Sequence, residues 1–195
     1  MPYSELLAPF HFLPETYVVI DTETTGLFEG DVAPDPVTLG VVRIDKGKVL
    51  SRHEFKIRST RSYTHNAQSV HSIASRTAHE FPKLSESWPA ICELTDSTYV
   101  VAYNALFDWR VLVAAGEASD LPPLKPHGVF CAQRAAQPWA MANGLECTER
   151  GPTLDAVSKF LGLSSDARHS AIGDAFLAHQ VIATLRARFK GAIDI

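Results

Sequence analysis

A chain of 195 residues that is 46% hydrophobic and 21% charged can bury the core of one ordinary domain. Its formal net charge of −4 argues against tight nonspecific binding to a nucleic-acid backbone, although metal ions could still bridge it to phosphates. The three cysteines have no CxxC spacing, so we expect neither a disulfide framework nor a zinc site. We see no membrane span and no secretory signal, and we expect a reducing, cytoplasmic location.

Residues 1–16 are predicted to form an irregular N-terminal arm. Three prolines interrupt this segment, and aromatic side chains lie between them. These aromatics could pack on the rest of the chain or on a second subunit, and the sequence leaves both open. Residues 17–195 show no internal repeat and no linker, so we expect a single domain there.

The stretch Tyr17–Leu27 begins with the β-branched run that is typical of a central strand and then delivers Asp21 and Glu23. Side chains on a strand repeat every two residues, so these two carboxylates share one face. They repel each other, and a hard divalent cation such as Mg²⁺ or Mn²⁺ would offset that repulsion. The two acids could equally be a strand-end residue and a solvated loop residue. This segment alone does not decide between these interpretations.

Two further strands are predicted at residues 37–45 and 49–57, after a Pro/Asp/Gly loop at residues 28–36. The turn signal Lys46-Gly47 between them favours an antiparallel meander with the first strand. The polar segment 58–71 reads as a loop. His71 at its end could approach a ligand, although a single histidine in a loop is more often structural or simply exposed.

The central part of the chain predicts a helix over residues 84–94 and a strand over 98–102. The segment Asn104–Asp108 then leads into another helix, which places Asp108 in its first turn just beyond the end of a strand. Ligand sites cluster at such strand ends in open α/β sheets.

The C-terminal part predicts a short strand within residues 129–137 that runs into a helix stopping near Pro138. Thr153 is expected to cap the next helix and Gly162 to end it. A last helix extends from residue 170 to about 189. One apolar stripe marks its buried side: Ala171, Ala175, Ala178, Ile182 and Leu185.

Asp174 lies beside that apolar stripe, where an acid is out of place without a function, and His169 directly precedes the helix. Together with Asp21, Glu23 and Asp108, Asp174 makes a set of four carboxylates that could hold two divalent ions for phosphoryl chemistry. Histidine is the side chain best suited to act as a base near neutral pH, so His169 could take a proton from an attacking water.

At these positions the sequence resembles the DEDDh 3′–5′ exonucleases, which have the DnaQ-like, ribonuclease H-like fold. The resemblance rests on three motifs in order: Asp21–Leu27, Asn104–Asp108 and His169–Asp174. It covers roughly residues 17–185. The size of the chain and the segment Trp109–Leu112 look most like small stand-alone exonucleases such as exodeoxyribonuclease X.

The resemblance implies an α/β domain with a central mixed five-stranded sheet, an antiparallel meander followed by parallel strands, flanked by helices. It implies a two-metal exonuclease that releases nucleoside 5′-monophosphates from the 3′ end, with DNA as the expected polymer. Asp21, Glu23, Asp108 and Asp174 would hold two Mg²⁺ or Mn²⁺ ions, and His169 would be the general base. The residues implied to bind the terminal nucleotide are Thr24, Thr25, Gly26, Leu27, His71, Asn104 and Phe107.

Two positions depart from the family pattern. Tyr103 stands where the family often has a histidine, and Thr38, two residues before Gly40, stands where it often has an acid. Both departures concern substrate contacts more than chemistry. An exoribonuclease of the same family and a noncatalytic nucleic-acid-binding module remain as alternatives. The partner is expected to be single-stranded or 3′-terminal nucleic acid; the sequence does not identify a homodimer or a polymerase or repair partner.

Overall fold

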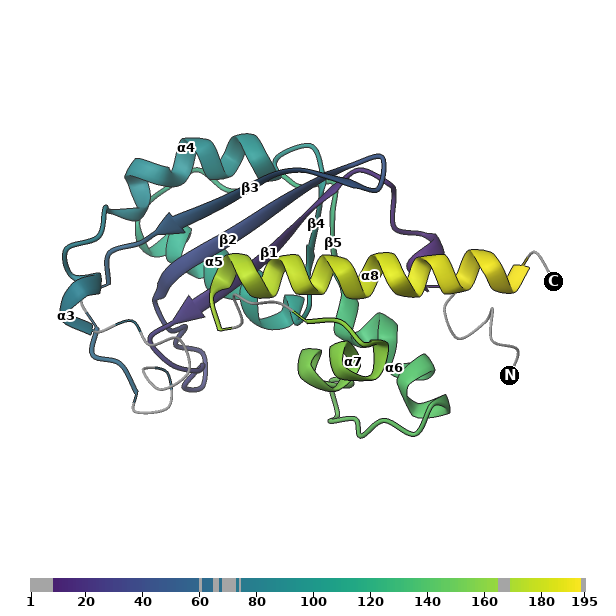
Figure 1. Cartoon of the computed structure of the whole chain (residues 1–195). Helices are drawn as coiled ribbons and strands as arrows, with labels where there is room; N and C mark the ends of the chain where they lie inside the picture. The colour runs from purple at the N-terminus through teal and green to yellow at the C-terminus, as the bar shows by residue number, and fades with distance from the viewer. Residues whose placement is uncertain are drawn as a thin grey trace.

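The computed structural model describes residues 9–59, 61–64, 67, 73, 75–164 and 169–193. Its strands form one five-stranded sheet in the order β3-β2-β1-β4-β5 (Figure 1). The strands β1, β2 and β3 pair antiparallel, whereas β1 with β4 and β4 with β5 pair parallel. The predicted mixed sheet is therefore confirmed. The strands are β1 Tyr17–Thr24, β2 Pro36–Asp45, β3 Lys48–Lys56, β4 Tyr99–Ala102 and β5 Gly128–Cys131.

Helices cover both faces of this sheet. The long helix α8 crosses β1 and β2 on one face, where it shares a core with α6 and α7 (Figure 1). Helices α4 and α5 bury their apolar residues against the other face. No helix of the described ranges is long and apolar enough to cross a membrane. The helices are α3 Ser75–Ala78, α4 Leu84–Thr95, α5 Ala105–Ala118, α6 Ala132–Ala142, α7 Leu154–Leu161 and α8 Ala171–Ile193.

The strand β1 lies in the middle of the sheet and is buried on both sides. Val19 belongs to the core under α8, whereas Val18 and Ile20 belong to the core under α4 and α5. A strand covered on both faces reads as a continuous apolar run rather than as an alternating one. This position explains why β1 starts with a β-branched run and how it can present polar side chains to either layer.

The caps predicted for α7 are present in the structure. The Thr153 hydroxyl accepts a hydrogen bond from the backbone N–H of Ala156 at 3.1 Å, and Gly162 ends the helix with a left-handed φ of 69°. The apolar stripe predicted for α8 is also confirmed, because all five of its residues are buried.

The prediction that the helix after β5 stops near Pro138 was wrong. Helix α6 includes Pro138 and continues to Ala142. Proline removes one helical hydrogen bond. Trp139 and Ala140, which follow it, are fully buried in the core beneath α8. Burial of these side chains outweighs the local preference of proline to end a helix.

The described part of the N-terminal arm packs on the same chain. Phe10 and Leu13 are buried in the core beneath α8, and the ring of Phe10 lies 5.8 Å from that of Phe130. The guanidinium of Arg186 on α8 donates to the carbonyl oxygen of Pro14 at 2.9 Å. Phe12, by contrast, is 80% exposed. One side of this segment therefore completes the core of the domain.

Candidate active site

Two carboxylate side chains of the central strand point toward the face of the sheet that α8 covers. Asp21 and Glu23 lie near the end of β1, two residues apart, and they follow Tyr17 and Val19 on the same face. Glu23 is only 8% exposed, and Asp21 is half-buried. The strand thus brings two acids to the edge of a buried layer.

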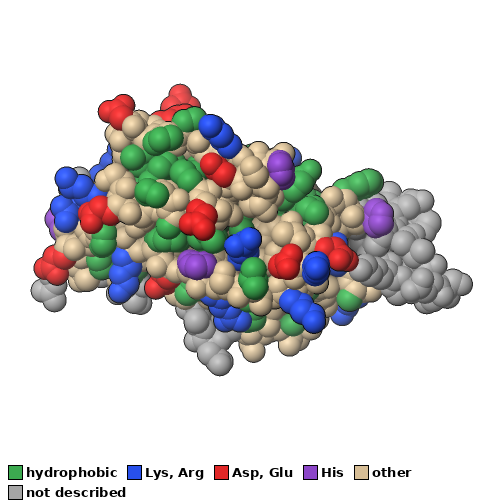
Figure 2. Space-filling view, turned by 90° about the horizontal axis from the view of Figure 1, so that it is seen from above, with side chains coloured by type: hydrophobic (Ala, Val, Ile, Leu, Met, Phe, Trp, Pro, Cys, Tyr) green, Lys and Arg blue, Asp and Glu red, His purple; other side chains and the backbone are tan. Residues whose placement is uncertain are grey.

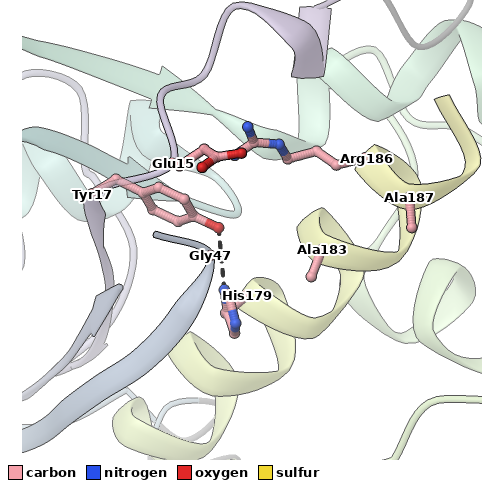
Figure 3. Close-up of a pocket in the computed structure, with 7 residues that line it drawn as sticks. All are labelled: Glu15, Tyr17, Gly47, His179, Ala183, Arg186 and Ala187. Atoms are coloured by element: carbon pink, nitrogen blue, oxygen red, sulfur yellow. Dashed lines mark hydrogen bonds between the residues drawn. The ribbon is translucent and has the colours of Figure 1, made fainter. Parts of the chain in front are cut away.

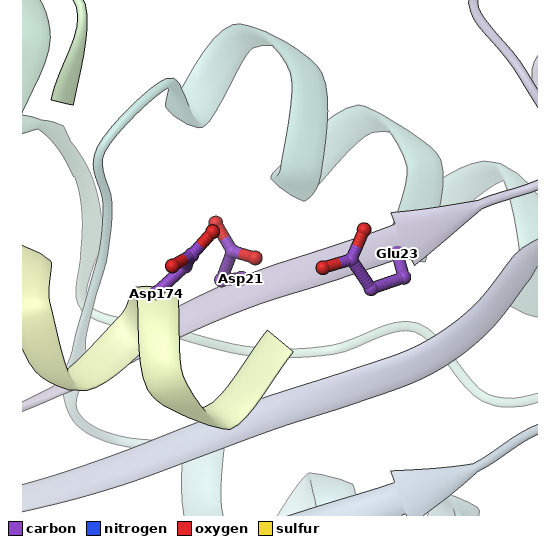
Figure 4. A group of neighbouring side chains, drawn as sticks. All are labelled: Asp21, Glu23 and Asp174. Atoms are coloured by element: carbon purple, nitrogen blue, oxygen red, sulfur yellow. The ribbon is translucent and has the colours of Figure 1, made fainter. Parts of the chain in front are cut away.

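Asp174 reaches the same place from the first turn of α8. The backbone N–H of Asp174 donates to the carbonyl of Ser170, whose hydroxyl accepts from the N–H of Gly173. These contacts fix the start of the helix. Figure 4 shows the Asp174 side chain directed at Asp21, with Glu23 farther along the same strand.

Gly40 explains how α8 comes so close to the sheet. It pairs with Asp21 across β1 and β2. A Cβ atom on Gly40 would lie 2.3 Å from the carbonyl carbon of Ala171, a distance no side chain could occupy. A glycine inside a strand often marks such a close approach of another backbone. Gly40 therefore lets the start of α8 rest directly on β2, which sets Asp174 opposite Asp21.

The three acids make a compact cluster. One carboxylate oxygen from each of Asp21, Glu23 and Asp174 can be chosen so that all three lie within 4.8 Å of one another. Three like charges at this spacing repel, and hard oxygen donors are the ligands that Mg²⁺ and Mn²⁺ prefer. The donor set therefore fits a divalent cation.

Asp108 approaches from the other layer. It lies in the first turn of α5 and is 4% exposed. One of its carboxylate oxygens accepts from the backbone N–H of Thr22 at 3.0 Å and from the Thr22 hydroxyl at 2.8 Å. Thr22 lies between Asp21 and Glu23 on β1, so these bonds tie the fourth acid to the acidic strand. Asp108 itself lies outside the cluster of three.

The environment of Asp108 changes its pKa. Burial, together with the charge of Asp174, raises the pKa of this carboxyl to about 6, against the lowering effect of the hydrogen bonds from Thr22. An ionised Asp108 therefore costs free energy in the metal-free protein. A cation nearby would favour the ionised form.

His169 differs from the acids in its setting. Its side chain is exposed, and its backbone has a left-handed φ of 61°, directly before α8. This backbone conformation is uncommon for a residue other than glycine and often occurs at functional sites. His169 is thus an exposed residue five positions before Asp174, directly ahead of the helix that carries that acid.

The loop after β1 is held by segments that follow it. Thr25 exchanges two hydrogen bonds with Asp35, and the Thr25 carbonyl accepts from the N–H of Thr64. The Asp35 carboxylate in turn accepts from the Ser59 hydroxyl and lies 3.2 Å from the guanidinium of Arg61. Asp35 therefore joins the loop of the first motif to the segment 58–64, and it was not identified from the sequence.

The residues predicted to bind substrate, His71 aside, fall into three groups. Thr24, Thr25 and Gly26 line the end of β1, where the Thr24 hydroxyl donates to the Gly26 carbonyl at 2.7 Å. Leu27 and Phe107 line one pocket, described next. Asn104 precedes α5, and its buried side-chain oxygen has no hydrogen-bond partner among the described residues. His71 lies outside the described residues.

A pocket of about 280 Å³ opens beside the loop of the first motif. Its aromatic wall is ordered, because the rings of Phe28 and Phe107 meet edge to face at 5.7 Å. The Arg110 guanidinium lies 4.4 Å from the centre of the Phe28 ring. Leu27 is 75% exposed at the rim. The residues lining the pocket are Leu27, Phe28, Leu106, Phe107, Arg110 and Arg150.

Two acids on a central strand, one after β4 and one at the start of a C-terminal helix make a pattern that matches a known family. The model of the exonuclease family RNase_T matches residues 18–182. The chain belongs to this exonuclease family. Its fold is the DnaQ-like, ribonuclease H-like fold.

Relatives of the chain include polymerase-associated proteins. A DNA polymerase III subunit epsilon-like protein of Rhodobacter capsulatus is 30% identical over 82% of this chain and 22% of its own length. The PolC-type DNA polymerase III of Thermotoga petrophila is 27% identical over 85% of this chain and 11% of its own length. The chain thus spans only about a tenth to a fifth of the length of these curated relatives.

Solved structures show the same fold. E. coli Exonuclease I in complex with a dT13 oligonucleotide superposes with a TM-score of 0.75 at 16% identity, over 93% of this chain and 43% of the other. Exonuclease X in complex with 5′ overhanging duplex DNA gives a TM-score of 0.63 at 21% identity, over 88% and 92% of the two chains.

A second polar contact between β1 and α8 lies away from the acids. The Tyr17 hydroxyl is 3.2 Å from Nδ1 of His179 in a pocket of about 180 Å³, where Arg186 lies beside Glu15 (Figure 3). Burial lowers the pKa of His179 to about 4, helped by the charge of Arg52. Burial also raises the pKa of Tyr17 to about 12, and Arg186 opposes that change. Both side chains are therefore neutral near pH 7.

Proposed function

We propose that this chain is a metal-dependent 3′–5′ exonuclease that hydrolyses DNA and releases nucleoside 5′-monophosphates. The observation that carries the proposal is the convergence of Asp21, Glu23 and Asp174 in a chain of the exonuclease family. DNA is favoured over RNA because two solved structures of the same fold are complexes with DNA.

The four acids would hold two divalent ions, Mg²⁺ or Mn²⁺. Asp21, Glu23 and Asp174 supply the compact donor set, and Asp108 adds a carboxylate from the other layer. When bound, such ions ease deprotonation of the attacking water and stabilise the leaving oxygen. Thr22 keeps one Asp108 oxygen occupied with two hydrogen bonds, which fixes the orientation of that carboxylate.

His169 is assigned as the general base. Its exposed position at the start of α8 leaves its ring accessible to a water above the acids. The neutral ring takes the proton from that water as the water attacks phosphorus, and it then releases the proton to solvent.

The terminal nucleotide would lie between the loop of the first motif and the start of α5. Leu27 and Phe107 offer an apolar wall for its base. Asn104, directly before α5, would complete the site on the side of Phe107. Asp35 and Thr64 hold the Thr25 backbone from outside, so the loop is ordered before substrate binds.

Digestion of 5′-labelled oligonucleotides tests this proposal. Single-stranded DNA, duplex DNA and RNA of one sequence are incubated with Mg²⁺ or Mn²⁺, and the products are resolved on a gel. We expect a ladder of 5′-labelled DNA fragments, each shortened from the 3′ end. We expect no activity in EDTA and no cleavage of circular single-stranded DNA. The control is Asp21→Asn, which should give no ladder.

Several outcomes would overturn the proposal. Full activity in EDTA contradicts the role of metal, and cleavage of the circle as fast as the linear strand contradicts an end-specific pocket. A ladder from RNA alone identifies an exoribonuclease. Binding of DNA without hydrolysis in either metal identifies a noncatalytic module.

A further inference from the structure

The turn between α6 and α7 carries an arginine at its tip. Thr148 and Gly151 exchange backbone hydrogen bonds at 2.9 and 3.0 Å, and the Thr148 hydroxyl donates to the same Gly151 carbonyl. The backbone N–H of Arg150 donates to the Thr148 hydroxyl oxygen at 3.2 Å. Arg150 is exposed. The turn is therefore closed on itself and presents one guanidinium.

This turn is anchored to the strand end that precedes Asp108. The Tyr103 hydroxyl and the side-chain amide of Gln133 both donate to the carbonyl oxygen of Pro152 at 3.0 Å. The Gln133 backbone N–H donates to the Tyr103 carbonyl at 2.8 Å. Gly151 passes so close to Gln133 that a Cβ would lie 2.6 Å from the Gln133 carbonyl oxygen. These contacts fix the turn against the second motif.

The anchored turn places Arg150 on the wall of the pocket that Leu27 and Phe107 also line. The other guanidinium of this pocket, that of Arg110, is already stacked on Phe28. Within the described part of the chain Arg150 makes no ion pair. Arg150 is thus the cation of this pocket whose charge is not engaged by a neighbouring side chain.

The charge of the rest of the molecule makes a cation in this pocket important for binding nucleic acid. The chain has a formal net charge of −4, and Figure 2 shows basic and acidic side chains interspersed on one face of the molecule. A strand of nucleic acid carries one phosphate per nucleotide, and arginine binds a phosphate through two parallel hydrogen bonds.

We propose that Arg150 binds a backbone phosphate of the substrate strand and holds the strand over the pocket. Tyr103 and Gln133 are positioning residues, because they fix Pro152 and with it the turn that carries Arg150. The proposal rests on the proposed exonuclease function and deepens it. It also gives a role to Tyr103, which stands where the family often has a histidine.

Salt dependence of turnover on a single-stranded DNA oligonucleotide tests this inference. The variants are Arg150→Ala, Arg150→Lys and the control Arg43→Ala, in which an exposed arginine of β2 is removed. We expect Arg150→Ala to raise KM about tenfold, the effect of losing a charged hydrogen-bonded contact, with little change in kcat. The slope of log(kcat/KM) against log[KCl] should become shallower by about 0.7, the value for one phosphate contact on a single strand.

The conservative variants distinguish the loss of a phosphate contact from a general loss of structure. Arg150→Lys should keep the wild-type salt slope, because the charge is kept, while KM rises less than in Arg150→Ala. Tyr103→Phe should reproduce part of the KM effect in the wild-type background and add nothing in the Arg150→Ala background, since both changes act through one contact. Arg43→Ala should match the wild type in both quantities.

The inference is overturned if Arg150→Ala keeps the wild-type KM and slope, or if Arg43→Ala changes the slope equally. Inactivity of the wild-type protein would instead overturn the proposed function. The inference is then decided by fluorescence anisotropy with the same oligonucleotide. Weaker binding and a shallower salt slope for Arg150→Ala would support it, and equal binding would refute it.

Discussion

The contact between β1 and α8 has two polar ends that differ in kind. At one end Tyr17 of the strand meets His179 of the helix, and at the other Asp21 and Glu23 meet Asp174. The two elements are the same, and they run side by side across the sheet (Figure 1). The two ends differ only in the side chains that β1 and α8 present to each other.

The first end pairs two neutral groups, whereas the second gathers three acids. Tyr17 and His179 are both neutral near pH 7 and share a hydrogen bond. The three acids at the other end gather like charges within 4.8 Å. Such a cluster costs stability unless a cation offsets it. Like charges gathered at the edge of a core are therefore a stronger sign of function than a neutral hydrogen-bonded pair.

The largest expected effect follows from removing one charge of the acidic end. Asp174→Asn keeps the shape of the side chain but weakens cation binding, so we expect a loss of activity of about 10⁴-fold or more, equivalent to several kcal/mol of transition-state stabilisation. The melting temperature of the metal-free protein should stay the same or rise, because repulsion is relieved. Single-turnover assays and thermal melts in EDTA measure both. A large drop in melting temperature would assign Asp174 a structural role.

His169→Ala should lower turnover by about 10²–10⁴-fold, the usual contribution of a positioned base. The variant should also differ from the wild type in its pH–rate profile, because it lacks the general base. Metal affinity should change little, because His169 is not assigned as a ligand. A single-turnover pH profile and a calorimetric metal titration check this. Loss of metal binding in His169→Ala would place His169 among the ligands instead.

Gly40→Ala tests whether the close approach of α8 holds the acidic end together. The new methyl group would collide with the backbone of Ala171, so α8 must shift. We expect a loss of about 1–3 kcal/mol of unfolding free energy, as for other overpacked sites, together with weaker metal binding. Urea unfolding and metal titration measure the two effects.

Gly144→Ala is the matched control for Gly40→Ala. A Cβ at Gly144 meets no atom within 4 Å, although its φ of +74° makes alanine strained there. This variant should lose stability without losing metal affinity. Equal metal affinity in the Gly40→Ala and Gly144→Ala variants would contradict the positioning role of Gly40.

The sequence predicted the elements of the site because their signals are local. The β-branched run before Asp21 marks a central strand, and the apolar stripe of α8 makes Asp174 stand out. The spacing of Asp21 and Glu23 alone predicts that they share a face. The catalytic roles of these residues stay predictions.

Contacts between distant segments could not be predicted in this way. The approach of α8 to Gly40 depends on how a helix and a strand far apart in sequence pack together. A glycine in the middle of a strand was the only local signal for it. Likewise, the hydrogen bonds of Asp108 to Thr22 depend on where β4 lies beside β1. Pro138 misled the prediction because buried neighbours outweigh a local preference.

His179 at the neutral end, and Asp108, which is tied to the acidic strand from the other face of the sheet, should change the unfolding free energy in opposite directions with pH in EDTA. The pKa of His179 is lowered to about 4, so its stabilising effect is complete above pH 6.5 and is lost as pH falls toward 4. The pKa of Asp108 is raised to about 6, so its cost is absent below pH 3.8 and grows as pH rises through 6. Between about pH 4 and pH 6, His179 therefore makes the unfolding free energy rise with pH, whereas Asp108 makes it fall.

Variants at Asp108 and His179 show how much each residue contributes to the pH dependence of the unfolding free energy. Asp108→Asn should show an unfolding free energy that rises by about 2 kcal/mol more than in the wild type between pH 4.5 and 6.5, and His179→Gln should deviate in the opposite direction. Urea unfolding at the two pH values measures this. Parallel profiles for the wild type and both variants would show that neither residue titrates as described.

The smallest expected effect comes from Tyr17→Phe at the neutral end. The change removes one hydroxyl and leaves Nδ1 of the buried His179 without its partner. We expect a loss of about 1–2 kcal/mol in unfolding free energy, the usual cost of an unsatisfied buried group. Activity and metal affinity should match the wild type, because α8 remains seated on Gly40 and Asp174 stays opposite Asp21. Urea unfolding at pH 7 and single-turnover assays give the two quantities. If Tyr17→Phe instead weakened metal binding as Asp174→Asn does, the two ends of α8 would be coupled, and the neutral contact would belong to the active site.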